Sequence, residues 1–137
     1  MVKIGIIGAT GYTGLELLKI LARHPLAKIA WLTSENSAGQ RFGDVFPAAP
    51  FIGDTILVKA VDADLATADV VFCCLPHATA QAPVAAARRA GARVVDLSAD
   101  YRIHDAAAYE TYRHAPIMPG IDIYNLEAEA YGAEMAR

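Results

Sequence analysis

The sequence predicts an α/β fold with a mostly parallel sheet and helices on both of its faces. Apolar runs that suit buried strands alternate with segments whose apolar residues recur at helical spacing. These segments follow one another in the order β-α-β-β-α-β, which favours parallel strands joined by crossovers. A glycine-rich turn, Gly8–Gly14, joins the first strand to the first helix.

The first part of the chain is predicted to form two strands and a helix. Val2–Ile7 is a largely apolar run that is typical of a buried strand. The helix after it is expected at about Thr13–His24, where apolar residues share one face, and Pro25 ends it. Lys28–Leu32 is the second predicted strand. The polar, proline-marked stretch Thr33–Phe51 is predicted to be a loop.

The middle of the chain is predicted to supply three more strands and a second helix. In chain order, the expected elements are a strand at Ile56–Val61, a short helical turn at Asp64–Ala68, a strand at Asp69–Leu75, a helix at Ala78–Ala90 and a strand at Arg93–Leu97. The strand at Asp69–Leu75 is almost entirely apolar, as expected for a strand covered on both faces. Gly91 is expected to cap the second helix at its C-terminus.

The strand pattern stops after Asp105. Ala106–Tyr112 is compatible with one more helix, and His114–Ile121, which contains two prolines, is predicted to be a loop. Glu127–Arg137 is compatible with a terminal helix, although it lacks a convincing apolar stripe. The pattern indicates no domain boundary before about Tyr101.

Bulk properties exclude several classes of protein. A length of 137 residues, with 55% hydrophobic and 20% charged residues, is typical of one globular domain. The net charge of −3 gives no indication of a nucleic-acid or anionic-membrane partner. The apolar runs are too short to span a bilayer, and the N-terminus lacks the features of a signal peptide. A cytoplasmic location is therefore expected.

The glycine turn has the spacing G-x-x-G-x-x-G between a predicted strand and a predicted helix. Such a turn lets the backbone approach a pyrophosphate, and the helix N-terminus offers free N–H groups to the phosphates. The sequence therefore predicts a dinucleotide site on a Rossmann-type, doubly wound fold. The candidate cofactor-binding residues here are Gly8, Thr10, Gly11, Tyr12, Thr13 and Gly14. A turn without a ligand is the alternative, and for Tyr12 simple packing over the turn is as well supported.

Three motifs together resemble N-acetyl-γ-glutamyl-phosphate reductases. They are the glycine turn, Leu75-Pro76-His77, and the stretch from Asp96 to Arg102, which reads DLSADYR. The resemblance extends from Met1 to about Tyr112. It implies a cofactor-binding domain at residues 1–112, with 113–137 as a tail that is compatible with a loop and a terminal helix. The aspartate-semialdehyde dehydrogenases are related in fold and chemistry.

The resemblance implies an NADPH-dependent reduction of N-acetyl-γ-glutamyl phosphate to the semialdehyde, a step of arginine biosynthesis. Thr33 and Ser34 follow the second strand, where a hydroxyl suits the 2′-phosphate of NADP(H) better than the usual acid of NAD-binding folds. However, Glu35 stands where members of the family often have Arg. An ordinary solvated loop remains the alternative for this segment.

A second group of candidates follows the later strands, at the sheet edge where ligands bind in open α/β folds. The resemblance places Pro76 and His77 beside the nicotinamide half of the cofactor, although a lone His is more often structural. Ser98 ends the next strand at the same edge. Arg102 either holds a substrate phosphate through its planar fork or pairs with a nearby aspartate, Asp96 or Asp100.

The family reaction requires a thiolate that displaces phosphate from the acyl phosphate. In the family this Cys lies in an Asn-Pro-Gly-Cys motif, which the sequence does not contain. We therefore expect no catalytic residue here: the chain matches the cofactor-binding portion of an enzyme whose missing domain would bind the small acyl phosphate and carry any oligomer contacts. A non-catalytic NADP-binding module, or part of an aspartate-semialdehyde dehydrogenase-like enzyme, is the alternative. Cys73 and Cys74 are predicted to be buried core residues, and their spacing predicts no metal site.

Overall fold

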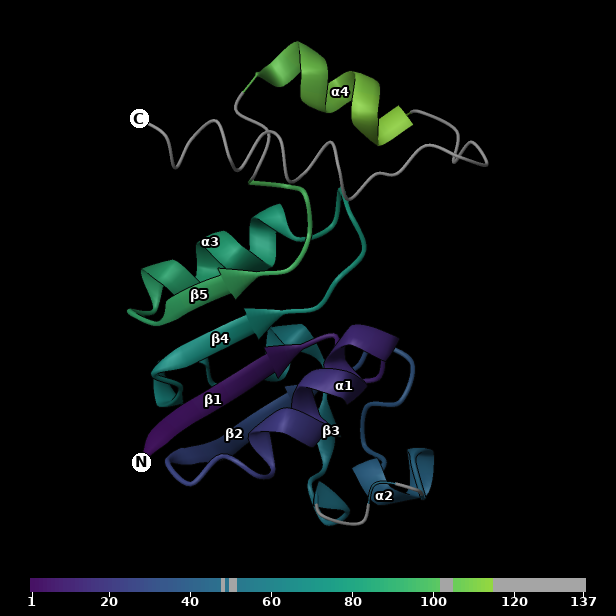
Figure 1. The fold of residues 1–137 in the computed structure, drawn as a ribbon, viewed down its shortest axis with the longest axis vertical. Coiled ribbons are helices and arrows are strands. Elements are labelled where there is room, and N and C mark those ends of the chain that lie inside the picture. The colour runs from purple at the N-terminus through teal and green to yellow at the C-terminus, as the bar shows by residue number, and fades with distance from the viewer. Residues whose placement is uncertain (48, 50–51, 102–104, 115–137) are drawn as a thin grey trace.

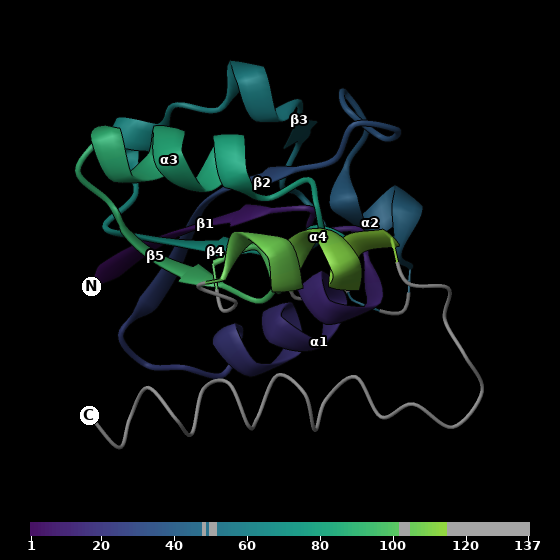
Figure 2. The same cartoon turned by 90° about the horizontal axis from the view of Figure 1, so that it is seen from above.

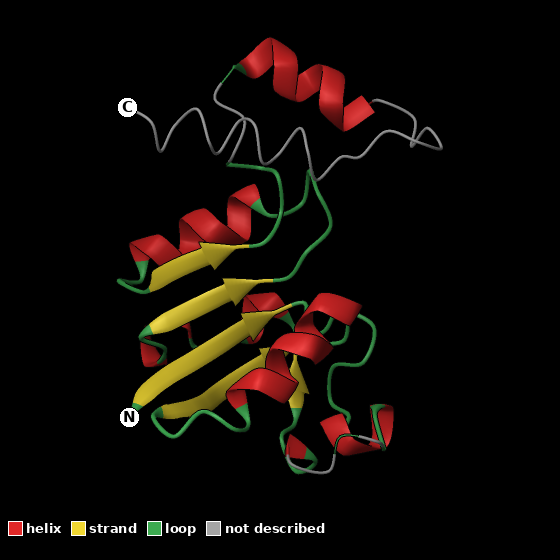
Figure 3. Cartoon of the chain, in the orientation of Figure 1, coloured by secondary structure: helices red, strands yellow, loops and turns green. Residues whose placement is uncertain are grey.

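A computed structural model describes residues 1–137 except 48, 50–51, 102–104 and 115–137 (Figure 1). Its centre is a sheet of five parallel strands in the order β3-β2-β1-β4-β5 (Figure 3). The strands are β1 at Val2–Ile7, β2 at Ala27–Thr33, β3 at Leu57–Val58, β4 at Val70–Cys73 and β5 at Arg93–Asp96. The parallel sheet predicted from the alternation of strands and helices is confirmed.

Helices cover both faces of the sheet. The helices of the described chain are α1 at Tyr12–Leu21, α2 at Phe42–Val45, α3 at Gln81–Arg89 and α4 at Ala106–His114, with 3-10 turns at Ala60–Asp62 and Leu65–Thr67. Figure 2 shows α1 and α3 on opposite faces. Because the strands are buried by helices on both sides, apolar residues fill successive strand positions, as in β1 and β4.

The core consists of one apolar cluster on each face. On the α1 side, Leu18 packs with Ile4 and Ile6 of β1 and with Leu32 of β2. On the α3 side, the cluster contains Ile7, Trp31, Val71, Cys73, Val84 and Ala87. Alternate residues of one strand therefore serve the two clusters, as strand geometry requires. This packing fixes the strand ends, and with them the loops that carry the candidate site.

Two predicted elements need correction. The stretch Thr33–Phe51, predicted to be a loop, contains the short helix α2, because Phe42 is fully buried and anchors this segment to the α1-side cluster. The third strand was predicted at Ile56–Val61, but β3 has only Leu57 and Val58. Val61 is 87% exposed, so its apolar side chain does not extend the strand.

The remaining predicted elements agree with the structure within a few residues. Helix α1 ends at Leu21, three residues before the predicted His24, and α4 confirms the helix predicted at Ala106–Tyr112. The loop and helix predicted within His114–Ile121 and Glu127–Arg137 lie outside the described residues, apart from His114, which ends α4. In the described part of the chain, no helix combines the length and the apolar character that a bilayer crossing requires.

Candidate functional site

The loops of interest meet at the carboxyl edge of the sheet. Strand order reverses direction there between β1, which continues toward β2 and β3, and β4, which continues toward β5. Ligands of open α/β sheets bind in the crevice outside such a switch point. The glycine turn lies at this point, between the ends of β2 and β4. Its Ala9 N–H donates to the Thr33 carbonyl at 2.9 Å, and just before the turn the Ile7 carbonyl accepts from Cys74 N–H at 2.8 Å.

Two glycines of the turn are required by the fold itself. Gly8 has a φ of +80°, and a Cβ there would lie 2.7 Å from the Cys74 carbonyl oxygen. Gly14 is buried in α1, and a Cβ there would lie 2.7 Å from the Ala9 carbonyl oxygen. In both cases the neighbour is backbone, so no side-chain movement can make room. Gly8 allows the tight turn, and Gly14 allows α1 to pack closely against it.

Gly11 differs from the other two glycines. Its φ of −75° and ψ of 164° are open to any residue. A Cβ there would lie 3.5 Å from the Gly8 carbonyl oxygen, which is ordinary van der Waals contact. Gly11 is also exposed and occupies the N-cap position of α1 without a side chain over the free N–H groups of the helix. The described fold therefore gives no steric reason for glycine at this position.

The hydroxyls at the end of β2 brace the turn. Gly8 N–H donates to the Thr33 hydroxyl at 3.2 Å, and the Thr10 and Ser34 hydroxyls are hydrogen-bonded at 2.9 Å. Thr33 and Ser34 are both buried. The structure therefore brings these predicted residues together, with the hydroxyls of Thr33 and Ser34 engaged with the turn itself.

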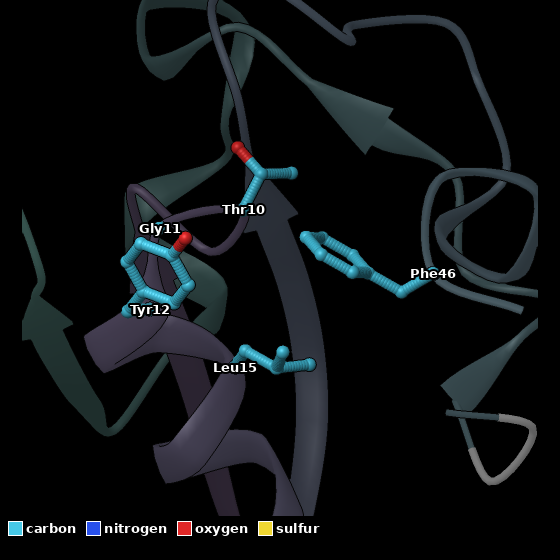
Figure 4. Close-up of a pocket in the computed structure, with 5 residues that line it drawn as sticks. All are labelled: Thr10, Gly11, Tyr12, Leu15 and Phe46. Atoms are coloured by element: carbon cyan, nitrogen blue, oxygen red, sulfur yellow. The ribbon is translucent and has the colours of Figure 1, made fainter. Parts of the chain in front are cut away.

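A pocket of about 330 Å³ opens beside the turn. It is lined by Thr10, Gly11, Tyr12, Leu15 and Phe46 (Figure 4). Tyr12 is 93% exposed, so the alternative that it packs over the turn is wrong, and Thr13 is also exposed. Sequence reasoning missed Leu15 and Phe46. Leu15 follows the turn at helical spacing, but Phe46 reaches the pocket through the unpredicted helix α2 and carried no local signal.

The charged residues after β2 are engaged with other parts of the chain. The Glu35 carboxylate accepts a hydrogen bond from Ala60 N–H at 3.0 Å. Arg41 forms an exposed ion pair with Asp54. The acid that follows Ser34 is thus turned toward the backbone beyond β3.

On the other side of the switch point, the loop after β4 contacts the loop after β5. Pro76 and His77 are exposed at this edge, and Ala99 N–H donates to His77 Nδ1 at 2.9 Å. Ser98 is fully buried, and its hydroxyl lies 2.9 Å from an Asp96 carboxylate oxygen. The structure therefore places Pro76, His77 and Ser98 at one edge, as predicted, with the Ser98 hydroxyl bonded inside the protein.

Two aspartates considered as partners of Arg102 have backbone partners. Asp96 accepts from Ser98 N–H at 2.9 Å, and Asp100 accepts from Ala78 N–H and Ala80 N–H. Arg102 lies outside the described residues. Sequence reasoning missed the role of Asp100, although the absence of Ser, Thr, Asp or Asn just before the predicted second helix was a signal that something else caps it.

The two thiols lie behind the turn and are not activated. Cys73 is fully buried, and burial raises the pKa of its thiol to about 12, with a further rise from the nearby Asp96. Cys74 is only half-buried, which corrects the prediction that both are buried, and burial raises its pKa to about 11. Among the described side chains, no three His, Cys, Asp or Glu residues are placed together to hold a metal ion.

Comparisons with known proteins show which family the chain resembles. Residues 3–119 match the family model "Semialdehyde dehydrogenase, NAD binding domain". The N-acetyl-γ-glutamyl-phosphate reductase of Rhodobacter capsulatus is 49% identical over 114 residues, 83% of this chain and 33% of that protein. A probable chloroplastic enzyme of that name from Arabidopsis thaliana is 42% identical, over 84% of this chain and 28% of its own.

Solved structures show the same fold. A crystal structure of aspartate semialdehyde dehydrogenase with NADP from Candida albicans matches with a TM-score of 0.67 and 27% identity, over 76% of this chain and 31% of that one. The chain spans about a third of the length of the curated relatives it matches.

Proposed function

The chain belongs to the semialdehyde dehydrogenase NAD-binding domain family, and from this premise we propose that it is the NADP(H)-binding portion of an N-acetyl-γ-glutamyl-phosphate reductase. Binding of a nicotinamide cofactor follows from the family. The proposal adds the choice of NADP(H), the residues that hold it, the extent of the domain at residues 1–112, and the reaction of the complete enzyme.

The contrast among the three glycines of the turn carries the proposal. Gly8 and Gly14 are required because a Cβ at either position would overlap backbone atoms. Gly11 meets no such overlap, and it leaves open space at the N-terminus of α1 that a side chain would otherwise fill. A pyrophosphate needs such an approach to free N–H groups, and the helix N-terminus favours its negative charge. The turn therefore fits the group. We assign the pyrophosphate to the backbone at Gly11, Tyr12 and Thr13.

The pocket beside Gly11 fits one end of a dinucleotide. Its apolar walls, Leu15 and Phe46, would pack against a ring, and the Thr10 hydroxyl lies at the same opening. Because Thr10 is bonded to Ser34, the end of β2 sets the position of this hydroxyl. We assign the adenosine half of the cofactor to this side of the switch point.

The surroundings of β2 favour NADP(H) over NAD(H). Folds that select NAD use an acid after the second strand to hold the ribose 2′-hydroxyl. Here Thr33 ends β2 and Ser34 follows it, and the Glu35 carboxylate after them accepts a hydrogen bond from Ala60 N–H. The carboxylate in this segment is therefore engaged with the backbone rather than held toward a ribose 2′-hydroxyl, which favours a 2′-phosphate at this position. Arg41, engaged with Asp54, lies in the same segment.

The reaction of the complete enzyme is proposed from its relatives. Proteins named N-acetyl-γ-glutamyl-phosphate reductase are 42–49% identical to this chain, whereas the aspartate semialdehyde dehydrogenase of Candida albicans is 27% identical. The acyl phosphate is therefore the favoured substrate class. The nicotinamide supplies the hydride when it is bound. The role of this chain is to bind the cofactor and to present its nicotinamide end at the edge near Pro76 and His77.

The test is a titration of NADPH fluorescence against the wild-type chain and Gly11→Val. We expect the variant to bind at least about tenfold more weakly, because the valine side chain occupies the pyrophosphate approach. Loss of a favourable N-cap should cost only about 1 kcal/mol of stability, which urea unfolding will show. Ala22→Val, at the exposed far end of α1, is the control for added volume. Equal NADPH affinity in wild type and Gly11→Val would contradict the proposal.

A further inference from the structure

Helix α3 begins without a cap of its own. Its N-cap residue is Ala80, which provides no side-chain hydrogen bond, and its first turn contains no acid. The residue two positions earlier, Ala78, has a φ of 68°, the sole positive value of a residue other than glycine in the described part of the chain. A β-carbon makes this left-handed conformation unfavourable, so it persists only where the surroundings hold it.

Asp100, which comes from the loop after β5, holds both positions. One carboxylate oxygen accepts from Ala78 N–H at 2.6 Å, and the other accepts from Ala80 N–H at 2.8 Å. Asp100 is 5% exposed, and the Tyr109 hydroxyl of α4 also lies 3.1 Å from its Oδ1. The carboxylate thus accepts from the N-cap N–H of α3 and from the amide two residues earlier, and its negative charge complements the positive end of the α3 dipole.

The same two loops are joined at further points. Ala99 N–H donates to His77 Nδ1, and the Tyr101 hydroxyl donates to the Gln81 carbonyl at 3.0 Å. Within the β4–α3 loop, the Thr79 hydroxyl donates to the Pro76 carbonyl at 2.6 Å. The path of Pro76–Ala80 is therefore set by the loop after β5 as well as by its own sequence.

We propose that Asp100 is a positioning residue for the cofactor: by holding Ala78 and Ala80, it sets the β4–α3 loop against the nicotinamide end. This inference rests on the proposed function. A dinucleotide extends across the switch point, and its adenosine ribose lies on the β2 side. The loop that Asp100 holds is on the opposite side, so it serves the other half of the same ligand.

This division between the two halves of the cofactor gives a sharp test. NADPH reaches both sides of the switch point, whereas adenosine 2′,5′-bisphosphate represents only the adenosine side. Asp100→Asn retains the shape of the side chain but replaces one acceptor oxygen with a donor, which cannot accept from a backbone N–H. Asp69→Asn is the matched control, because Asp69 also accepts from a backbone N–H, that of Lys3, at the opposite end of the sheet.

The affinities of both ligands are measured for wild type, Asp100→Asn and Asp69→Asn. We expect Asp100→Asn to bind NADPH about tenfold more weakly and adenosine 2′,5′-bisphosphate within about twofold of wild type. Asp69→Asn should change neither affinity. Adding Ala78→Gly to Asp100→Asn should restore part of the NADPH affinity, because glycine adopts the left-handed conformation without strain.

Amide hydrogen exchange gives a second measurement that needs no cofactor. In Asp100→Asn, the amides of Ala78 and Ala80 should exchange faster, while that of Ile6 in β1 should not change. Unchanged NADPH affinity, an equal loss for both ligands, or unchanged exchange at Ala78 and Ala80 would each overturn the positioning role. A wild-type chain that binds neither ligand would overturn the proposed function and this role with it. If wild type binds NADPH and Asp100→Asn binds it equally well, the positioning role of Asp100 is overturned and the proposed function stands.

Discussion

Cys73 and Cys74 are adjacent in sequence but differ in their exposure and in their thiol pKa. The thiolate is the reactive form, and burial raises the two pKa values to about 12 and about 11 from 9.0. At pH 8 we expect a thiol reagent to label the native chain about 100-fold more slowly than the urea-unfolded chain, with half-buried Cys74 reacting before Cys73. Labelling of the native chain as fast as the unfolded chain would contradict the burial of Cys73 in β4.

The same pKa values predict how stability depends on pH. Because folding raises both thiol pKa values, their contribution is complete below the unfolded value of 9.0 and is lost as pH rises toward about 11 and about 12. Each thiol should reduce the free energy of unfolding by up to about 1.4 kcal/mol per pH unit in that window. Urea unfolding from pH 8 to pH 11 measures this slope, and Cys73→Ala should make it shallower.

At the scale of elements, the contact between α1 and the glycine turn depends on Gly14. A Cβ at Gly14 would lie within 2.8 Å of three backbone atoms, so only separation of the helix from the turn can relieve the overlap. We expect Gly14→Ala to lower the free energy of unfolding by about 3 kcal/mol. Gly11→Ala, which adds the same methyl group in open space at the N-cap, should cost about 1 kcal/mol. Equal urea midpoints for the two variants would contradict this assignment.

Local patterns predicted most elements because each depends on residues close in sequence. The apolar runs at β1 and β4 and the helical spacing in α1 are signals of this kind, and so is the glycine turn. The length of β3 has no such local signal, because it depends on how far β2 extends beside it. Helix α2 also depends on a distant contact, the burial of Phe42 against the α1-side cluster.

The candidate site also has features that local sequence predicts and features that depend on contacts between distant residues. The turn and the strand ends were predicted from their own residues, and the structure brings them to one edge. The hydrogen bonds from Ala78 and Ala80 to Asp100 join positions 20 or more residues apart, so no local pattern contains them. The engagement of the Thr33 and Ser98 hydroxyls is likewise a product of tertiary contacts.

At the scale of the whole molecule, we expect this chain alone not to reduce an acyl phosphate. The family reaction needs a thiolate with a base nearby, and the sequence has two cysteines, both with raised pKa values. The rate should be several orders of magnitude below that of a full-length reductase, as when a nucleophile is removed. The assay uses N-acetyl-γ-glutamyl phosphate and NADPH with both proteins side by side. Comparable turnover would show that Cys73 or Cys74 is a nucleophile.

Strand β1 is the first element of the chain and the central strand of the sheet. As the chain leaves the ribosome, β2 can pair with β1 early, but the other edge of β1 stays open until Val70 has been made to pair with Ile4. Pairings between such distant residues slow folding, and an open strand edge invites association with other chains. We therefore expect partly synthesised chains, in which the second half of the sheet does not yet exist, to be prone to aggregation.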